Sequence, residues 1–495
     1  MTATLTPETG QRRWGAEDLL RLVLDEGSWE SWDRPIDISG HDEPYQRELR
    51  AAREKAGTDE SVITGRGRVR GRPVAVVASE FRFLAGSIGR DAAGRITAAV
   101  RRATAEGLPL LATTASGGTR MQEGTPAFVE MVEITRALGT HRAAGLPYLV
   151  HLRHPTTGGV YASWGSLGHV TVAEPGALIG FLGPKVFEAL NGEPFPSGVQ
   201  YAENLAAKGV IDAVVSAEQL PELVDRSLRV LLDPAEPPSL PRRDPTALTA
   251  RSAWESVTLT QRPERAGVRD LLRYGATDTV RLRGTDEGEH DETVVVALTR
   301  LDGQPCVLVG QDRTKQHASK AMGPAALREA RRAMNLAEEL RLPLVTVIDT
   351  PGAELSVAAE ERAVAGEIAR CIATMTQMRV PTIAVLLGQG CGGGALALLA
   401  ANRVLAAQHA WLAPLPPEGA SVIVHGDTAH AEMMASKQQI RSIDLAANGT
   451  VHRIVPERDD DNAQTLARAV VAECASMLVN LKSRQGPAAT QRSGR

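Results

Sequence analysis

Short runs of hydrophobic residues alternate with amphipathic stretches along most of the chain. Four apolar runs have the length and composition of buried strands: Leu110–Thr114, Tyr148–Leu152, Leu344–Ile348 and Thr382–Leu387. Helical spacing appears before two of them, at Arg95–Glu106 and Ala325–Leu340, and the first of these places Ile96, Ala99, Val100 and Ala103 on one face. Strands that alternate with helices predict a largely parallel, buried sheet, that is, an α/β fold.

The same order of signals occurs twice at a nearly constant separation. Six pairs of landmarks separate by 234, 234, 234, 235, 233 and 233 residues: Pro109 and Pro343, Gly118 and Gly352, Pro147 and Pro381, Gly158-Gly159 and Gly393-Gly394, Ala177 and Ala410, Pro184 and Pro417. A drift of only one or two residues over six landmarks predicts an internal duplication.

A proline-rich segment lies between the two copies. Residues 233–245 contain five prolines, and proline at this density blocks helices and sheet ladders, which predicts a semi-rigid linker. We therefore expect one domain over residues 1–235, a linker over 236–250 and a second domain over 251–495.

Composition excludes several classes of protein. The 495 residues carry a net charge of −4 and only 3% aromatic residues, so neither a basic footprint nor stacking platforms indicate nucleic-acid binding. The four cysteines form no CxxC pair and no histidine lies at ligand spacing, which predicts free thiols, a reducing compartment and no metal. No signal peptide is evident, so we expect a cytoplasmic protein.

One uncharged stretch, Val380–Ala401, has the length of a membrane span. Pro381 and five glycines between Gly388 and Gly394 interrupt it. A strand, a glycine turn and a buried helix explain this pattern better, and we expect no membrane association.

Glycine pairs follow the strands in each copy and carry the candidate chemistry. Glycine at a strand-to-helix turn lets the backbone approach a ligand, and the N–H groups at the start of the helix favour an anion. Two such donors can form an oxyanion hole. Tight packing between helix and strand is the structural alternative for either turn taken singly, but their repetition in both copies favours function.

The remaining motifs offer little acid–base machinery. Ser116, in Ala-Ser-Gly-Gly, does not fit the G-x-S-x-G nucleophile motif, and the P-loop pattern is absent. The residues thus indicate an enzyme with two anion-stabilising sites, suited to an enolate and a second oxyanion.

With these turns in view, the chain resembles the carboxyltransferase component of biotin-dependent acyl-CoA carboxylases. The first half resembles the β subunit of the bacterial acetyl-CoA enzyme through LVLDEGSW (22–29), FRFLAGSIG (81–89), ASGGTRMQE (115–123), GGVYAS (158–163), VAEPGALIGFLG (172–183) and KGVID (208–212). The second half resembles the α subunit through MNLAE (334–338), IDTPGA (348–353), AEER (359–362), GQGCGGGALA (388–397) and PEG (417–419). The resemblance implies a fused β–α chain with a crotonase-like spiral domain in each half.

The resemblance also implies a reaction, in which a carboxylate moves from carboxybiotin to the α-carbon of a short acyl-CoA, with acetyl-CoA to malonyl-CoA as the expected conversion. On the acyl-CoA side, the N–H groups of Gly158 and Gly159, with Gly117 and Gly118 nearby, would hold the thioester oxygen as an enolate forms. On the biotin side, those of Gly393, Gly394 and Ala395, with Gly352 and Ala353, would hold the ureido oxygen. The biotin nitrogen would then take the α-proton, which explains the scarcity of acid–base residues.

Several further residues are candidates near these turns. Arg120, Arg313, Lys315 and Lys320 could bind the phosphates of coenzyme A, Tyr161 could shape the acyl pocket, and Glu123 is either a crotonase-type acid or a carboxylate at a helix start.

Partners follow from the same resemblance. No biotin-acceptor motif (Ala-Met-Lys-Met) and no ATP-grasp region is present, so biotin would arrive on a separate carrier protein charged by a separate biotin carboxylase. The family places its active site where the first half of one protomer faces the second half of another, which predicts a head-to-tail homodimer or a larger assembly.

Three departures from the family pattern bear on function. No cysteine precedes residue 22, so the zinc ribbon common in the bacterial β subunit is not expected. Glu354-Leu355-Ser356 replace an aromatic residue and a Pro-Gly, which puts a carboxylate beside the expected biotin pocket, and Cys391-Gly392 replace Gly-Ser.

Two alternatives stay open: a biotin-independent decarboxylase of a malonyl-type or polyketide acid, and a non-catalytic scaffold. Acyl chain length and pathway (fatty-acid, polyketide or catabolic) are also open.

Overall fold

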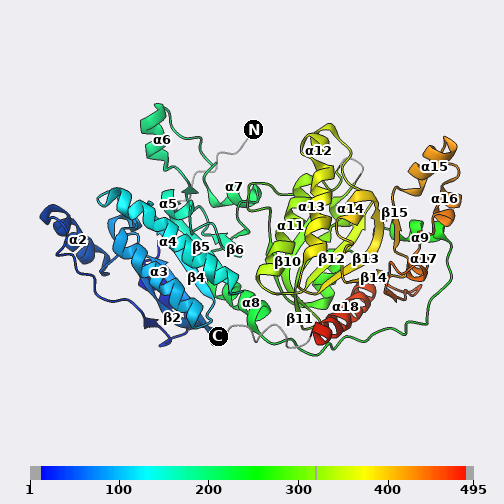
Figure 1. The fold of residues 1–495 in the computed structure, drawn as a ribbon, viewed down its shortest axis with the longest axis horizontal. Coiled ribbons are helices and arrows are strands. Elements are labelled where there is room, and N and C mark those ends of the chain that lie inside the picture. The colour runs from blue at the N-terminus through cyan, green and yellow to red at the C-terminus, as the bar shows by residue number, and fades with distance from the viewer. Residues whose placement is uncertain (1–12, 318–319, 486–495) are drawn as a thin grey trace. The chain divides into compact units, whose positions relative to one another are not determined.

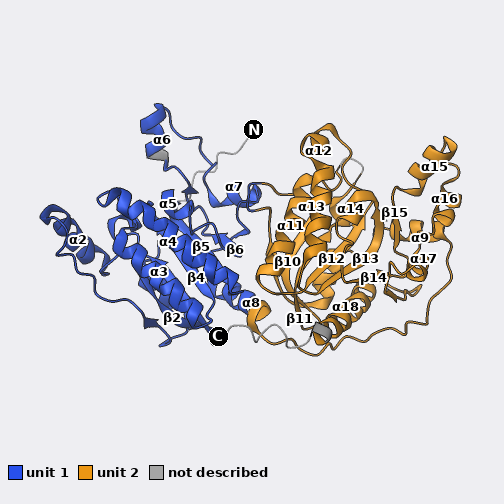
Figure 2. Ribbon diagram, in the orientation of Figure 1, with its two compact units in different colours: residues 1–228, 286–288 blue, residues 229–285, 289–495 orange. Residues whose placement is uncertain are grey.

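The computed structural model of the chain describes residues 13–317 and 320–485 and separates into two compact units. Unit 1 comprises residues 1–228 with 286–288, and unit 2 comprises residues 229–285 with 289–495 (Figure 2). Each unit has one eight-stranded sheet with helices packed on it (Figure 1). The predicted α/β class is confirmed.

The sheet of unit 1 has the strand order β1-β2-β3-β4-β5-β6-β8, with β7 paired to β5. The first three strands are antiparallel, and all later pairs are parallel. The strands are β1 (Glu30–Ser31), β2 (Val62–Val69), β3 (Arg72–Ser79), β4 (Leu110–Ser116), β5 (Tyr148–Thr157), β6 (Val170–Ala173), β7 (Ile179–Gly180) and β8 (Ala213–Val214). The helices are α1 (Ala16–Val23), α2 (Glu43–Ala56), η1 (Leu84–Gly86), α3 (Arg90–Ala105), α4 (Gly124–Ala143), α5 (Gly158–Tyr161), α6 (Pro184–Asn191), α7 (Ala202–Ala207) and α8 (Leu220–Leu232).

Unit 2 repeats this order strand for strand, as β9-β10-β11-β12-β13-β14-β16 with β15 paired to β13. The strands are β9 (Ala276–Leu282), β10 (Val294–Leu301), β11 (Gln304–Gln311), β12 (Leu344–Thr350), β13 (Thr382–Cys391), β14 (Arg403–Ala407), β15 (Trp411–Ala413) and β16 (Arg453–Val455). The helices are α9 (Ala253–Thr260), α10 (Val268–Gly275), η2 (Arg313–Lys315), α11 (Pro324–Glu339), α12 (Val357–Glu361), α13 (Val364–Gln377), α14 (Gly392–Leu396), α15 (Pro417–His425), α16 (Ala431–Lys437), α17 (Ser442–Ala447) and α18 (Ala463–Gln485). The predicted duplication is confirmed.

The predicted elements form where the hydrophobic pattern placed them. The expected apolar face of α3, Ile96, Ala99, Val100 and Ala103, is at most 3% exposed and lies in the core of unit 1. Full burial of a side chain the size of Ile96 or Val100 stabilises the fold by about 1.5–3 kcal/mol. The stretch Val380–Ala401 forms β13, a glycine turn and α14, and no helix of the described residues is long and apolar enough to cross a membrane.

A bulge in each sheet extends four strands beyond the ends that the sequence predicts, namely β4, β5, β12 and β13. The ladder between β4 and β5 shifts by two residues between Thr114 and Ser116, and the ladder between β12 and β13 shifts between Ile348 and Thr350. Each bulge lets pairing resume beyond the apolar run, so that the polar residues before each glycine turn belong to the sheet.

The proline-rich segment lies along unit 2. Ser239 donates to both carboxylate oxygens of Asp302 through its N–H, at 3.0 Å each, and Arg242 pairs with Glu473 at 2.8 Å. These contacts hold the segment against unit 2. The expected domain boundaries at 235 and 251 remain a prediction.

Candidate active site

In unit 1 the two predicted glycine turns contact each other through their backbones. A Cβ on Gly118 would lie 3.2 Å from the nitrogen of Gly159 and 3.3 Å from Cα of Gly158. Gly118 (φ +107°) and Gly158 (φ +62°) also adopt conformations that L side chains rarely take. The structure therefore brings the end of β4 and the start of α5 together at a point where side chains do not fit.

Unit 2 builds the same contact from different residues. A Cβ on Gly394 would lie 3.3 Å from the nitrogen of Ala353 and 3.4 Å from the carbonyl carbon of Gly352. Gly352 has φ +141° and Gly392, the first residue of α14, has φ +60°. The end of β12 and the start of α14 thus meet as β4 and α5 do.

The structure corrects one landmark of the duplication. Helix α5 begins at Gly158 and α14 at Gly392, both with φ near +60°, so the equivalent of Gly158-Gly159 is Gly392-Gly393 and the separation is again 234. The expected pairing with Gly393-Gly394 was wrong by one residue, because a run of three glycines gives sequence spacing no means to choose between adjacent pairs.

A hydroxyl group fixes each turn. Gly118 donates its N–H to Oγ of Ser116 at 3.0 Å, and Gly352 donates to Oγ1 of Thr350 at 3.1 Å. Ser116 and Thr350 are 234 residues apart, so this bond is also duplicated. In place of the nucleophile considered from the sequence, Ser116 accepts this bond and itself donates to the carbonyl of Gly86 at 2.5 Å.

These bonds narrow the set of N–H groups that can meet a ligand. The N–H of Gly117 is used by the carbonyl of Ala85, at 2.9 Å, and that of Gly118 by Ser116. Thr119 forms a parallel bridge with Ile88. The two hydrogen bonds of this bridge run from the N–H of Ile88 to the carbonyl of Gly118 and from the N–H of Arg120 to the carbonyl of Ile88, so the N–H of Thr119 points away from Ile88. The groups left to face a ligand are Thr119 with Gly159 in unit 1 and, by equivalence, Ala353 with Gly393 in unit 2. Gly394 follows Gly393 in the first turn of α14. Sequence reasoning missed Thr119, although its distance of 234 from Ala353 could have indicated it.

Two side chains that the sequence analysis did not single out hold the turn of unit 2. Gln311, fully buried at the end of β11, accepts from the N–H of Asp349 at 2.9 Å and donates to the carbonyl of Gly394 at 2.8 Å, which ties β12 to α14. The buried carboxylate of Asp349 accepts from the N–H of Gln389 at 3.0 Å across the bulge. Burial raises the pKa of Asp349, an effect that the nearby Arg313 guanidinium opposes.

Glu354 is engaged away from the glycine contact. Ser356 donates its hydroxyl to Oε1 of Glu354 at 2.6 Å. Oε2 lies 2.7 Å from the place that a Cβ on Gly323 would take, at the start of α11, where the helix dipole favours a negative charge. The carboxylate thus stabilises the start of a helix, while its backbone follows Gly352 and Ala353.

The candidate cations and Tyr161 lie in different environments. The side chain of Arg313 is 11% exposed and donates to the carbonyls of Thr260 and Arg262, whereas Lys315 and Lys320 are more than 40% exposed and pair with Glu292. Tyr161 is half-buried in α5, and burial raises its pKa to about 12.

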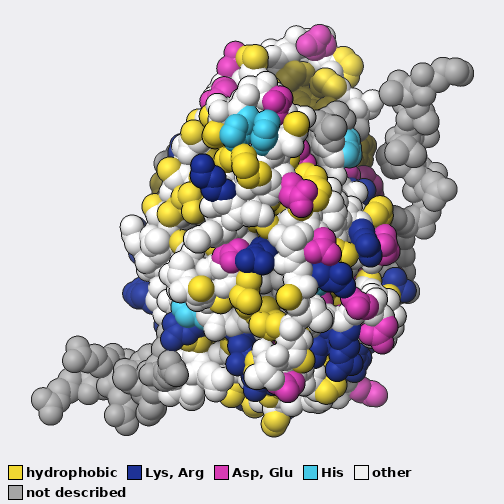
Figure 3. Space-filling model, turned by 90° about the vertical axis from the view of Figure 1, so that its right-hand side faces the viewer, with side chains coloured by type: hydrophobic (Ala, Val, Ile, Leu, Met, Phe, Trp, Pro, Cys, Tyr) yellow, Lys and Arg dark blue, Asp and Glu magenta, His cyan; other side chains and the backbone are white. Residues whose placement is uncertain are grey.

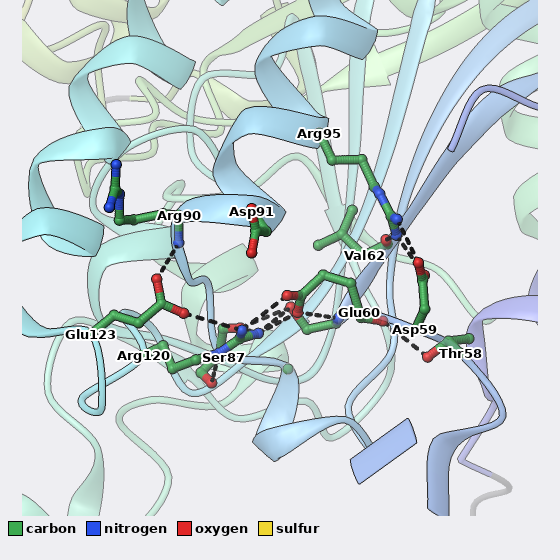
Figure 4. Close-up of polar contacts among 12 residues, drawn as sticks. Thr58, Asp59, Glu60, Val62, Ser87, Arg90, Asp91, Arg95, Arg120 and Glu123 are labelled. Carbon is green, nitrogen blue, oxygen red and sulfur yellow. Dashed lines mark hydrogen bonds and ion pairs between the residues drawn. The ribbon is translucent and has the colours of Figure 1, made fainter. Parts of the chain in front are cut away.

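Arg120 and Glu123 belong to a buried cluster in unit 1 (Figure 4). The Arg120 side chain is 1% exposed and pairs with Glu60, so its guanidinium does not face solvent, where a phosphate would approach. Glu123 accepts from the N–H of Arg90, the first residue of α3, at 2.7 Å. Among the described residues no group of three or more histidine, cysteine, aspartate or glutamate side chains is arranged to hold a metal ion.

Comparison with known proteins shows the family to which this chain belongs. The model of the carboxyl transferase domain family matches residues 22–492. A probable biotin-dependent acyl-coenzyme A carboxylase beta3 subunit of Mycobacterium tuberculosis is 58% identical over 92% of this chain and 93% of its own length. The acetyl-coenzyme A carboxylase carboxyl transferase subunits beta/alpha of Saccharopolyspora erythraea are 35% identical over 94% of this chain and 85% of theirs.

Among solved structures, transcarboxylase 12S superimposes with a TM-score of 0.74 at 21% identity, over 94% of this chain and 90% of that one. This likeness confirms the predicted duplicated, crotonase-like fold. With the family model spanning nearly the whole sequence and both halves carrying the same glycine contact, the chain belongs to the carboxyl transferase domain family.

Proposed function

We propose that this protein is the carboxyltransferase component of a biotin-dependent acyl-CoA carboxylase and that acetyl-CoA is its preferred acceptor. The duplicated glycine contact carries the proposal, because it supplies two anion-stabilising turns in one chain. Family membership and the relatives' names support carboxyl transfer to an acyl-CoA. The choice of acetyl-CoA rests on the sequence motifs and on the 35%-identical relative named for it.

In unit 1 the N–H groups of Thr119 and Gly159 would hold the thioester oxygen as it gains charge. The loss of one donor of an oxyanion hole costs roughly 3–4 kcal/mol of transition-state stabilisation, so two fixed backbone donors account for a large share of such a reaction. Gly158 lets the chain turn sharply enough to present Gly159, and the half-buried Tyr161 lies in the same short helix.

In unit 2 the N–H groups of Ala353 and Gly393 would hold the ureido oxygen of carboxybiotin, with Gly394 and Ala395 following in the same helix. Charge on that oxygen weakens the bond between nitrogen and carboxylate, so that CO2 is released and the nitrogen keeps the bonding electrons. The freed nitrogen can then take the α-proton of the acyl-CoA, and the enolate that results attacks the CO2 to form the new carbon–carbon bond. Neither step requires an acid or base from the protein, in keeping with the engagement of Glu123 and Glu354 elsewhere.

A cavity of about 450 Å³ beside the first turn supports the assignment of coenzyme A to unit 1. It is lined by Ala85, whose carbonyl holds the N–H of Gly117, and by Leu84, Phe81, Lys55 and Arg82. The lining also includes Glu48, and Arg82 is paired with Glu80 at 2.9 Å, so the apolar walls suit the adenine of coenzyme A and Lys55 suits a phosphate.

We further propose that the carrier of biotin and the biotin carboxylase are separate proteins and that the chain self-associates. Large hydrophobic side chains are exposed on both units, at Phe128 and Val132 of α4 and at Val422 and Ile423 of α15. Exposed hydrophobic and charged side chains intermingle on the face drawn in Figure 3. Neighbouring exposed hydrophobic side chains on one helix, as on α4 and α15, are typical of protein interfaces. Light scattering after gel filtration should give a dimer or a larger species, and a monomer would contradict this part.

The test of acceptor choice is the reverse reaction with free biocytin. Malonyl-CoA and methylmalonyl-CoA are compared at equal concentration, and release of the decarboxylated thioester is followed. The proposal predicts a higher kcat/KM for malonyl-CoA, whereas preference for methylmalonyl-CoA would assign a propionyl-CoA carboxylase.

A further inference from the structure

Arg120 follows the glycine turn of unit 1 by two residues, and its side chain points into the protein. Its backbone N–H donates to the carbonyl of Ile88 at 2.9 Å. The equivalent residue of unit 2, 234 positions on, is Glu354, whose N–H donates to the carbonyl of Met322 at the same distance. The two halves therefore share their backbone here and differ in the side chain, so the buried arginine is a feature of unit 1 that the duplication itself does not require.

The guanidinium of Arg120 is held from several directions (Figure 4). It donates to both carboxylate oxygens of Glu60, to the carbonyl of Ser87 at 2.8 Å and to the hydroxyl of Tyr45 at 3.3 Å. It also lies 3.4 Å from the carboxylate of Glu123. Burial by itself would lower the pKa of Arg120, but the hydrogen bonds and charge of Glu60 more than reverse this, so the side chain stays charged.

The segment that Arg120 contacts is strained and holds the glycine turn. Leu84 (φ +42°) and Ala85 (φ +55°) are both in the left-handed region, where L residues persist only if their surroundings fix them. The carbonyl of Ala85 accepts from Gly117, and the N–H of Ile88 donates to Gly118, each at 2.9 Å. Residues 84–88 therefore set the position of residues 117–119.

We propose that Arg120 is a positioning residue for the acyl-CoA side of the reaction, which clamps the strained segment 84–88 and thereby fixes the N–H groups offered to the thioester oxygen. This inference rests on the proposed function. Because the oxygen gains its charge only as the enolate forms, a loosened turn lowers kcat more than it weakens binding of the thioester.

Arg95 offers a matched control within the same region. Its side chain is 6% exposed, pairs with Asp59 through two bonds of 3.0 Å and donates to the carbonyl of Val62 at 2.9 Å. It thus joins a buried arginine to Asp59, the neighbour of Glu60, whose side chain is 37% exposed. Its partners all lie within residues 33–62, away from the strained segment and the glycine turn.

The experiment compares Arg120→Lys with Arg95→Lys in the full chain. Both substitutions remove a planar, two-pronged donor and should lower Tm, Arg120→Lys by more because its partner Glu60 is also buried. For Arg120→Lys we expect kcat of biocytin-dependent release from malonyl-CoA to fall ten- to hundredfold with KM within twofold of wild type, since small misplacements of a catalytic group have effects of about this size. Arg95→Lys should keep kcat within about threefold.

A second readout does not depend on activity. Hydrogen exchange followed by mass spectrometry should show faster exchange of residues 84–89 and 115–121 in Arg120→Lys and not in Arg95→Lys. Equal losses of kcat in the two variants, a change in KM alone, or unchanged exchange in those segments would overturn the inference. If wild type released no product from any thioester, the proposed function would fail, and hydrogen exchange would still decide whether Arg120 clamps the turn.

Discussion

Replacement of Gly394 by alanine is the most informative single change in the glycine contacts. The new Cβ would lie 3.3 Å from the nitrogen of Ala353 and 3.4 Å from the carbonyl carbon of Gly352, whereas carbon atoms in favourable contact lie about 3.5–4.0 Å apart. The two backbone segments must then separate by a few tenths of an ångström. Gly394 does not have a positive φ, so alanine adds no backbone strain.

The expected loss follows from this displacement. Removal of a whole oxyanion donor costs about 10²–10³ in kcat, and a donor that is shifted but retained should cost about tenfold, or roughly 1.4 kcal/mol. Gly394→Val adds two methyl groups with no room at the same contact and should abolish transfer. Gly393→Ala should cost less, because its Cβ meets only the end of the Ile368 side chain, at 2.6 Å, which can rotate away.

The assay is biocytin-dependent release of acetyl-CoA from malonyl-CoA, with Tm measured for each variant. Gly94→Ala, on an exposed position of α3 with nothing within 4 Å of its Cβ, is the matched control and should be fully active and about 0.5–1 kcal/mol more stable. Wild-type activity of Gly394→Val in a folded protein would refute the assignment of this turn to catalysis.

Three further predictions concern the fold and the thiols. Gly118→Ala combines a φ of +107° with a Cβ 3.2 Å from the nitrogen of Gly159, so both transfer and about 1–3 kcal/mol of stability should be lost, as measured by kinetics and urea unfolding. Burial lowers the pKa of His151 to about 4, so the unfolded chain binds more protons between pH 4 and 6.5; stability should fall by up to about 3 kcal/mol as pH drops through that window, and less in His151→Gln. Burial raises the pKa of the thiols of all four cysteines, Cys306, Cys371, Cys391 and Cys474. Iodoacetamide at pH 8 should therefore label none of them in the native protein and all four in urea. Labelling of the native protein would contradict the structure.

The periodicity of apolar residues and the spacing of glycines and prolines were enough to predict the fold and the position of the two turns. Glycines at constant separation, such as Gly118 and Gly352, indicated both the duplication and the backbone contacts, because only glycine permits them. The apolar runs located β4, β5, β12 and β13 but not their ends, since a bulge brings polar residues such as Thr156 back into the ladder.

Contacts between residues distant in sequence could not be predicted. The sequence predicted Arg120 as a phosphate-binding residue, because nothing in it indicates that Arg120 is buried and paired with Glu60. Gln311 and Asp349 lie near strand ends, where polar residues are common and indicate no special function. They hold the glycine turn only because α14 packs close to these strand ends in the folded protein. The pairing of Gly158 with Gly392 required the φ angles and the first residues of α5 and α14.

The central claim is that one chain contains two oxyanion-stabilising turns, one for an acyl-CoA thioester and one for carboxybiotin. The most direct measurement follows acetyl-CoA release from malonyl-CoA by the purified protein with and without free biocytin. The account predicts release only when biocytin is present, and its loss in both Gly118→Ala and Gly394→Val. Release at the same rate without biocytin would contradict the biotin assignment of unit 2 and indicate a decarboxylase.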